Sequence, residues 1–395
     1  MRNVRSMSDF TKHRYENVAD LGHASYIENI RCDESDPTNH SMDDVSLMYT
    51  IPVEHYKRMS PAKWNNKAFS HRFQRMCSAF GESCLMIRKP GLELVNYLKH
   101  TNPEKAVNRY IIHGKTGCGK SMTLQYALHY CMSNNWLILP AYHFWDNVKF
   151  NYHTKLKRKG ELTVSQFNKD RLDQPVYSLK WLETFGWLNQ KLLGEIKTTT
   201  KYIWSKHESS EEGTSLSALV DLGKARPRHS TDVIGCIMKE IRLQDHTTMP
   251  SVLVAVDCIN AAFGKTLMKY DGKPVTTDQL SFMCNFKKIL SNDWKNGAVV
   301  GALDTLGLRQ SETTDLVEGE HPYDLLGREG FDLLDPHILI HVQPYTDQEV
   351  LAQLAYYKDC KWLIDRSLTA AGEAEIIQLC GNNPADITNY CAGLY

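Results

Sequence analysis

A glycine-rich octapeptide constrains the fold of this chain more than any other feature. Residues Gly114–Ser121 read GKTGCGKS and fit the pattern G-x-x-x-x-G-K-[ST]. An apolar run, Tyr110–His113, precedes them, and a helix-like segment, Met122–Met132, follows. In this context of strand, glycine loop and helix, backbone N–H groups can curl around an anion, and the helix N-terminus adds positive charge. The sequence therefore predicts a phosphate-binding loop rather than a chance glycine turn.

The pattern assigns a role to particular residues. Lys120 is expected to reach the β- and γ-phosphates of a nucleotide, and the Ser121 hydroxyl to ligate Mg²⁺. Asp257 follows five apolar residues, Val252–Val256, and is expected to hold Mg²⁺ from the end of a neighbouring strand; otherwise it is a turn residue. The metal residues are thus Ser121 and Asp257. The expected nucleotide-binding residues are Gly114, Lys115, Thr116, Gly117, Cys118, Gly119, Lys120 and Ser121.

The residue after Asp257 argues against rapid hydrolysis. Many ATP-hydrolysing proteins of this architecture carry a glutamate there, whereas this chain has Cys258. Loss of a general base costs roughly 10²–10⁴ in rate, so we assign no catalytic residue. Asp304 could substitute if the fold brings it near the γ-phosphate, or it could be a cap or turn residue. No N-K-x-D segment follows the loop, which excludes a Ras-type switch and leaves Met86–Pro90 for base recognition.

Short apolar runs alternate with helical stretches along the middle of the chain. Parallel strands buried on both faces have this appearance. We expect an α/β fold of the P-loop NTPase (AAA-like) class, a doubly wound parallel sheet with a helical insertion and a helical C-terminal region. The expected strands are Arg109–His113, Trp136–Ala141, Val252–Asp257, Ala298–Leu303 and Ile338–Val342.

The same patterns divide the chain. Residues 1–45 are polar and suggest a flexible arm or an extended partner-binding tail. In the lead-in that follows, phenylalanines at 69, 73 and 80 and Met76 recur at helical spacing and predict a buried helix face. The insertion contains four tryptophans, which we interpret mainly as core or interface anchors. The expected regions are an arm 1–45, a helical lead-in 46–108, a nucleotide-binding core 109–345 with an insertion at about 144–230, and a helical region 346–395.

Charge and cysteine content limit the classes of partner. Lys plus Arg and Asp plus Glu each number 46, so any contact with nucleic acid should be local. Two basic runs, Lys155–Lys159 and Arg226–His229, either grip RNA phosphates or form a solvated face. Eleven cysteines without a C-x-x-C pair argue against zinc ribbons and iron–sulfur clusters and favour a reducing, intracellular compartment.

The N-terminal segment and the hydropathy bear on location. Met1–Met7 is basic, which is compatible with a mitochondrial presequence, but Asp9, Glu16 and Asp20 are atypical of one. No apolar run approaches the length of a membrane span.

Several strings, most of them outside the generic motif, resemble the death-associated protein family, the GTP-binding protein of the mitochondrial ribosome's small subunit. The similarity extends from about residue 45 to the C-terminus. These strings are Ser83–Pro90, Gly114–Ser121, Asn135–Pro140, Arg171–Pro175, Val254–Ala261, Asn292–Ala298 and Leu326–Pro336.

The resemblance implies a structural component of the small subunit in the mitochondrial matrix, supporting mitochondrial translation. It implies contacts with small-subunit ribosomal RNA, ribosomal proteins and, across the subunit interface, the large subunit. It also implies binding of GTP or GDP with Mg²⁺ through residues 114–121, with slow or no hydrolysis. The alternative is a nucleotide-hydrolysing AAA/STAND-like switch ATPase with an apoptotic signalling role.

Overall fold

The computed structural model describes residues 30–61, 68–142, 144, 162–243, 249–263, 265–305, 321–363 and 369–393. The chain forms two compact units. The larger comprises residues 33–45 and 49–343, and the smaller contains residues 46–48 and 344–395 together with the segment up to Cys32.

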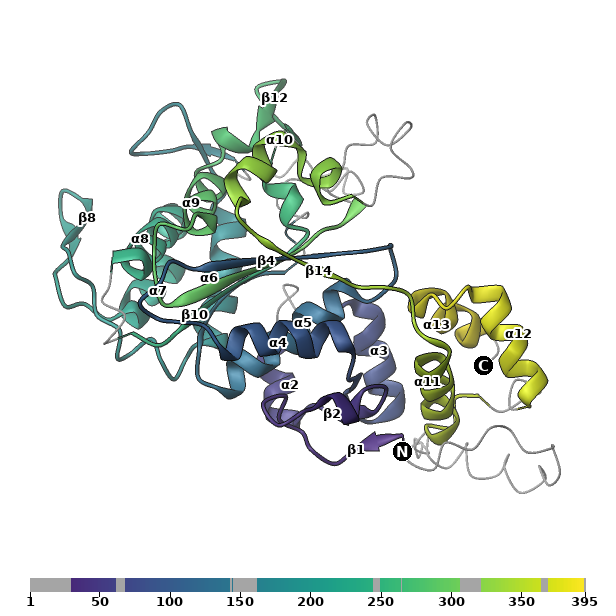
Figure 1. Cartoon of the computed structure of the whole chain (residues 1–395). Helices are drawn as coiled ribbons and strands as arrows, with labels where there is room; N and C mark the ends of the chain where they lie inside the picture. The colour runs from purple at the N-terminus through teal and green to yellow at the C-terminus, as the bar shows by residue number, and fades with distance from the viewer. Residues whose placement is uncertain are drawn as a thin grey trace, which may run out of the picture. The chain divides into compact units, whose positions relative to one another are not determined.

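A parallel sheet forms the centre of the larger unit (Figure 1). Its described strands run in the order β14-β4-β13-β10-β5, and every adjacent pair is parallel. The strands are β4 (Asn108–His113), β5 (Leu137–Ala141), β10 (Val252–Asp257), β13 (Gly297–Ala302) and β14 (Ile338–His341). The expected strands are thereby confirmed, with bounds that shift by at most one residue.

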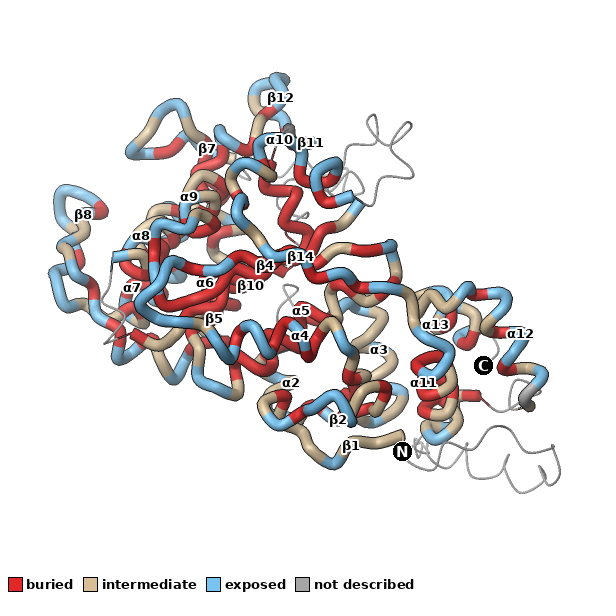
Figure 2. Tube along the Cα trace, in the orientation of Figure 1, coloured by how far each residue is buried: buried red, intermediate tan, exposed pale blue. Residues whose placement is uncertain are grey.

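Burial explains the strand composition. Every residue of β5, β10 and β13 is buried, so no alternation of polar and apolar residues is visible in the sequence. The red central strands in Figure 2 show this burial. Helices α4 (Lys89–Lys99) and α5 (Lys120–Ser133) pack on strands of this sheet. The hydrophobic core that joins the strands to the insertion is anchored by large side chains such as Trp181, Phe185, Phe282 and Phe286.

The insertion contains strands as well as helices, although the sequence predicted helices alone. Its elements are β6 (Thr163–Val164), β7 (Leu172–Asp173), α6 (Pro175–Leu188), β8 (Tyr202–Ser205), β9 (Glu208–Ser210), α7 (Leu216–Ala225), η3 (Pro227–His229) and α8 (Ser230–Leu243). Two short hairpins interrupt it. Thr-Val in β6 and Tyr-Ile-Trp in β8 favour extended backbone, and each pairs with a less typical strand, Leu-Asp or Glu-Ser-Ser.

The lead-in corrects one helical interpretation. Helix α3 begins at His71 after the Ser70 cap, so Phe69 precedes the helix and is itself buried. No residue of α3 is fully buried, and the predicted face is only partly covered. Helix α3 spans His71–Phe80, and the elements around it are η1 (Met42–Asp44), β2 (Met48–Thr50), α2 (Val53–Met59) and β3 (Cys84–Met86).

Part of the expected arm contacts the helices beside the sheet. His40 Nδ1 lies 2.8 Å from the Tyr126 hydroxyl on α5, and the Thr38 hydroxyl accepts from Asn134 at 2.8 Å. Residues 1–29 of that arm lie outside the described residues. After β10 come η4 (Ile259–Ala262), β11 (Lys265–Tyr270), β12 (Lys273–Thr276), η5 (Thr277–Gln279), α9 (Ser281–Leu290) and α10 (Pro322–Leu334).

The described part of the smaller unit is mainly helical. Thr346 and Glu349 form a capping box that begins α11. The Asn382 backbone carbonyl accepts from the Tyr345 N–H, which ties the start of this unit to the turn before its last helix. Its elements are β1 (Arg31–Cys32), α11 (Asp347–Asp359), α12 (Ala370–Cys380) and α13 (Pro384–Gly393).

Candidate nucleotide site

The loop 114–121 connects the end of β4 to the first turn of α5 and requires its glycines. Gly114, Gly117 and Gly119 have φ angles of 141°, 88° and 100°, a region that residues with a Cβ rarely adopt. A Cβ on Gly114 would lie 2.1 Å from the carbonyl oxygen of Val342, which follows β14. The close approach of two backbones therefore fixes glycine at this position.

Lys120 lies at the centre of the loop. Its Nζ donates to the carbonyl oxygens of Gly114 at 2.8 Å and Lys115 at 3.0 Å, and the residue is 8% exposed. The ammonium is thus held by backbone dipoles inside the curl rather than extended into solvent. This position, at the N-terminus of α5, concentrates positive charge where an anion can bind.

Ser121 and Asp257 meet although they lie far apart in sequence. Ser121 Oγ donates to Asp257 Oδ1 at 3.0 Å, and Asp257 is 8% exposed. Strand β13 lies between β4 and β10, so the first turn of α5 brings the hydroxyl to the carboxylate. Hydroxyl and carboxylate oxygens are ligands that Mg²⁺ accepts together with phosphate oxygens and water. The structure therefore brings the predicted metal residues together.

The polar residues after β10 are engaged in structural bonds. Cys258 adopts a left-handed conformation with φ of 66° and is the N-cap residue of η4. The Asn260 amide donates to the Asp304 carbonyl at 2.8 Å, and its oxygen accepts from the Asp304 N–H at 3.2 Å. The next residue, Thr305, places its hydroxyl oxygen 3.4 Å from that of Thr116. Asn260 thus holds the segment after β13 beside the loop, a role that its place in the sequence did not indicate.

Arg88 joins the lead-in to the loop. Its Nη1 donates to the Cys118 carbonyl at 2.9 Å, and its Nη2 donates to the Gln343 carbonyl at 3.0 Å. The segment expected to recognise the base therefore contacts the loop 114–121 through this guanidinium. A planar, multidentate donor suits such a bridge between two backbones.

A histidine pair lies at the ends of β4 and β14. The rings of His113 and His341 are stacked with centroids 4.7 Å apart. Burial, followed by the nearby His341, His321 and Lys120 charges, lowers the pKa of His113 to about 4. His113 is therefore neutral near pH 7. These residues are 228 positions apart in sequence, so no local spacing signals the pair.

Metal binding at this edge would depend on few protein ligands. Among the described residues, no group of three or more His, Cys, Asp or Glu side chains is arranged to hold a metal. A Mg²⁺ ion bound by Ser121, Asp257, water and phosphate oxygens needs no such cluster, because Mg²⁺ commonly keeps several waters.

The second basic run interacts with its own chain. Arg226 Nε lies 3.7 Å from Glu208 Oε1, Arg228 donates to Gln166 at 3.0 Å, and His229 is buried. The first run, Lys155–Lys159, lies outside the described residues.

Two of the three described tryptophans of the insertion are buried in the hydrophobic core. Trp181 and Trp204 are buried and donate their indole N–H groups to Pro140 and Ser210, respectively, whereas Trp187 is partly exposed. Trp145 lies outside the described residues.

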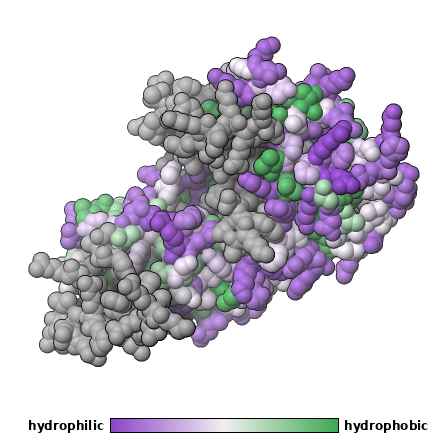
Figure 3. Space-filling model, turned by 180° about the vertical axis from the view of Figure 1, so that it is seen from behind, coloured by the Kyte–Doolittle hydropathy of each residue, from purple (hydrophilic) through white to green (hydrophobic). Residues whose placement is uncertain are grey.

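The described helices are too short or too polar to cross a lipid bilayer. On the face shown in Figure 3, hydrophobic residues form small separate groups among hydrophilic ones.

Comparison with known proteins reveals extended similarity. A family model described as mitochondrial ribosomal death-associated protein 3 matches residues 85–389. The small ribosomal subunit protein mS29 of Bos taurus is 36% identical over 368 residues, covering 91% of this chain and 87% of its own length. Its Mus musculus counterpart is 36% identical over 369 residues, covering 92% and 89%. The protein of that name from Neurospora crassa is 24% identical over 123 residues, covering 30% and 24%.

The matched range contains the loop 114–121, Asp257, the insertion and most of the smaller unit. The resemblance noted in the sequence is confirmed across most of the chain, and this protein belongs to the mitochondrial ribosomal death-associated protein 3 family.

Proposed function

We propose that this chain is a structural component of the small subunit of the mitochondrial ribosome, where it supports mitochondrial translation. The main support for this proposal is the 36% identity to mammalian small ribosomal subunit proteins mS29 over about nine-tenths of the chain. Its location is then the mitochondrial matrix. Its partners are small-subunit ribosomal RNA and ribosomal proteins, with a further contact to the large subunit across the interface.

Within that role, the chain binds GTP or GDP with Mg²⁺ at a P-loop. The supporting observation is the juxtaposition of Lys120 inside the glycine loop with the Ser121–Asp257 pair beside it. Lys120 would neutralise phosphate oxygens, and the loop N–H groups would orient them. The carboxyl edge of a parallel sheet is also where α/β proteins bind ligands.

The bound nucleotide stabilises the folded protein and is hydrolysed slowly or not at all. Cys258 occupies the place after Asp257, and the amide of Asn260 is used to hold the Asp304 backbone. Neither group orients or deprotonates water well, so hydrolysis is slow or absent. A ligand that binds only the folded state stabilises it by about 4 kcal/mol at a thousand times its dissociation constant.

The test separates the two parts of the proposal. Sedimentation of mitochondrial lysates asks whether the native protein travels with small subunits. Acid extraction of the purified protein and chromatography then identify the nucleotide, with guanine nucleotide near one equivalent expected. Absence from small subunits would refute the ribosomal role, and an empty or adenine-filled site would refute the nucleotide assignment.

Single-turnover hydrolysis distinguishes the switch ATPase. Active phosphoryl-transfer enzymes turn over at about 1–100 s⁻¹, and a rate in that range would favour the alternative function.

A further inference from the structure

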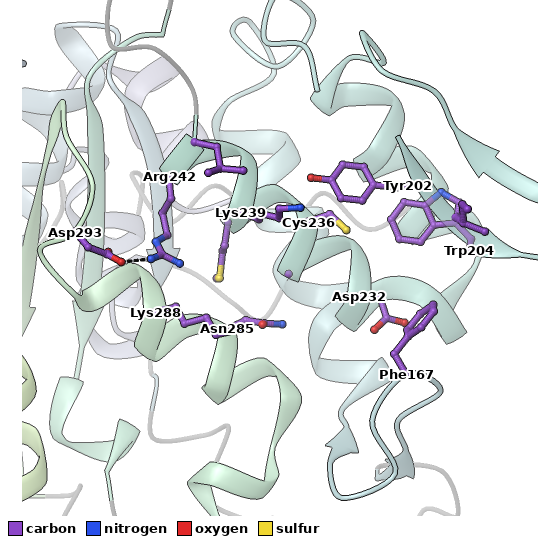
Figure 4. A pocket seen from close by; sticks show the side chains of 14 residues that line it. Phe167, Tyr202, Trp204, Asp232, Cys236, Lys239, Arg242, Asn285, Lys288 and Asp293 are labelled. Carbon is purple, nitrogen blue, oxygen red and sulfur yellow. Dashed lines mark hydrogen bonds and ion pairs between the residues drawn. The ribbon is translucent and has the colours of Figure 1, made fainter. Parts of the chain in front are cut away.

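A second concave site lies in the larger unit, among residues that the nucleotide site does not use. It is a cavity of about 830 Å³ between β8, α8 and α9. Figure 4 shows Tyr202 and Trp204 on one side, Arg242 and Asp293 on the other, and Lys239 between them. This volume falls within the range typical of ligand-binding pockets.

The cavity has an apolar rim that is exposed to solvent. Phe167, Ile203 and Leu243 are 61%, 65% and 57% exposed, and all line the same opening. Single exposed apolar residues are ordinary, but several around one concave site mark an interaction surface.

The floor of the cavity is tightly packed. A Cβ on Gly235 of α8 would lie 2.7 Å from the side-chain nitrogen of Asn285 on α9. The two helices therefore approach closely beneath the opening, and the cavity is built by the fold rather than by loosely placed side chains.

The acidic groups that line the cavity, Asp232 and Asp293, and the neighbouring Glu240 are already engaged or partly neutral. Asp293 forms an ion pair with Arg242 (Figure 4), and Glu240, beside Tyr202, accepts from the Thr199 N–H at 2.8 Å and hydroxyl at 2.9 Å. Burial, followed by the charge of Asp173, raises the pKa of Asp232 to about 7.

Two basic side chains of the cavity have no ion-pair partner among the described residues. Lys239 and Lys288 are exposed, and neither forms an ion pair with any described residue. The Lys239 ammonium lies 5.6 Å from the centre of the Tyr202 ring. The opening therefore combines apolar side chains with two lysines that form no ion pair with a described residue.

We propose that this cavity binds a segment of a partner protein in which apolar side chains are flanked by carboxylates. The apolar residues would insert beside Tyr202 and Met238, and the carboxylates would meet Lys239 and Lys288. Aromatic, methionine and arginine side chains at the centre of a pocket are typical of protein–protein interfaces.

An RNA partner fits these observations less well. Of the aromatic side chains that line the cavity, Trp204 is buried and Lys239 lies over the Tyr202 ring, which leaves Phe167 as a stacking surface. Ile203 and Leu243 offer no planar surface on which a base could stack. Arg242 is committed to Asp293, which leaves few cations for the phosphate contacts that dominate nucleic-acid affinity.

A site-specific photocrosslinker tests this directly. The full chain carries benzoylphenylalanine in place of Ile203 and is delivered to mitochondria, which are then irradiated. The side chain should crosslink to a protein segment. Mass spectrometry should identify that segment as apolar with at least two Asp or Glu residues. The matched control places it at Leu267, which is 50% exposed on β11 and does not line the cavity, and which should not give that product.

Charge reversal supplies the decisive comparison. In the Ile203 crosslinker background, Lys239→Glu with Lys288→Glu should lower the yield by about tenfold, since carboxylates would then face carboxylates. The control, Lys269→Glu with Lys273→Glu, makes the same charge change on the β11–β12 hairpin and should leave the yield unchanged. Thermal melts confirm that both double variants fold.

The proposal is overturned by a crosslink to RNA, by the same product from Leu267, by an unchanged yield after charge reversal, or by no protein crosslink from Ile203. Because irradiation is performed in whole mitochondria, these outcomes do not depend on whether the protein sediments with small subunits.

Discussion

The carboxyl edge of the sheet and the insertion cavity use lysine differently. At the sheet edge, Lys120 is buried and its ammonium bonds to two loop carbonyls. In the cavity, Lys239 and Lys288 are exposed without ion-pair partners among the described residues. The first arrangement is set by local backbone geometry and holds the ammonium inside the curl of the loop. The second depends on helices distant in sequence and presents charge at an opening.

The strongest test of this contrast targets the backbone of the loop. Gly114→Ala should lower the free energy of unfolding by about 3 kcal/mol, because φ is 141° and the new Cβ would lie 2.1 Å from the Val342 carbonyl oxygen. Gly272→Ala is the control, since its φ is 79° but nothing lies within 4 Å, and about 1 kcal/mol is expected. Chemical denaturation measures both. Equal effects would show that the close approach does not constrain the loop.

The next test removes the buried ammonium. Lys120→Ala should weaken nucleotide binding at least about a hundredfold, because charge-assisted bonds to phosphate are lost. Lys115→Ala, in the same loop but exposed, should change affinity much less. Nucleotide content after purification, measured by ion-exchange chromatography, distinguishes them. Full occupancy in the Lys120 variant would contradict the assignment.

The sheet edge was largely predictable from sequence, for physical reasons. Glycines that permit positive φ, an apolar strand before them and an acid after Val252–Val256 are all local signals. Such signals fix which side chains reach the end of a parallel sheet. They do not reveal Asn260 holding Asp304, nor His113 stacking on His341, because these contacts arise only from strand order.

The insertion shows the opposite balance. Its tryptophans and helical spacing indicated a packed subdomain, and Trp181 and Trp204 are buried as core residues. The sequence did not indicate the short strands or the cavity. Phe167 lies between β6 and β7, Ile203 on β8 and Leu243 at the end of α8, so no window of sequence brings them together. The position of such a site depends on packing between residues far apart in sequence, whereas the conformation of the loop depends on its local sequence.

A smaller effect is expected at the proposed metal ligands. Ser121→Ala should reduce the Mg²⁺-dependent part of nucleotide affinity by about tenfold, because one oxygen ligand next to Asp257 is lost. Ser121→Thr keeps the hydroxyl and should retain most of the affinity. Titration with a fluorescent guanine nucleotide, with and without Mg²⁺, measures the difference. If Ser121→Ala lost the same affinity in EDTA, the hydroxyl would have no metal role.

The smallest effect tests whether the two regions respond oppositely to pH. His113 has a folded pKa of about 4 against an ordinary value of 6.5, so the unfolded chain takes up a proton first as pH falls below 6.5. Its contribution to stability is therefore lost as pH falls from 6.5 toward 4. Asp232 has a folded pKa of about 7 against 3.8, so the folded chain holds the extra proton and stability falls as pH rises through this range.

Neutral substitutions at these positions should therefore move the pH dependence of stability in opposite directions. Between pH 5.5 and 7, His113→Asn should reduce the rise in free energy of unfolding by about 0.5 kcal/mol, and Asp232→Asn should increase it by a similar amount, after allowance for solvent screening. Urea denaturation at the two pH values measures both. If both variants changed this rise in the same direction, burial would shift the pKa of only one of the two groups as described. The sheet edge and the cavity would then not differ in the direction of their pH dependence.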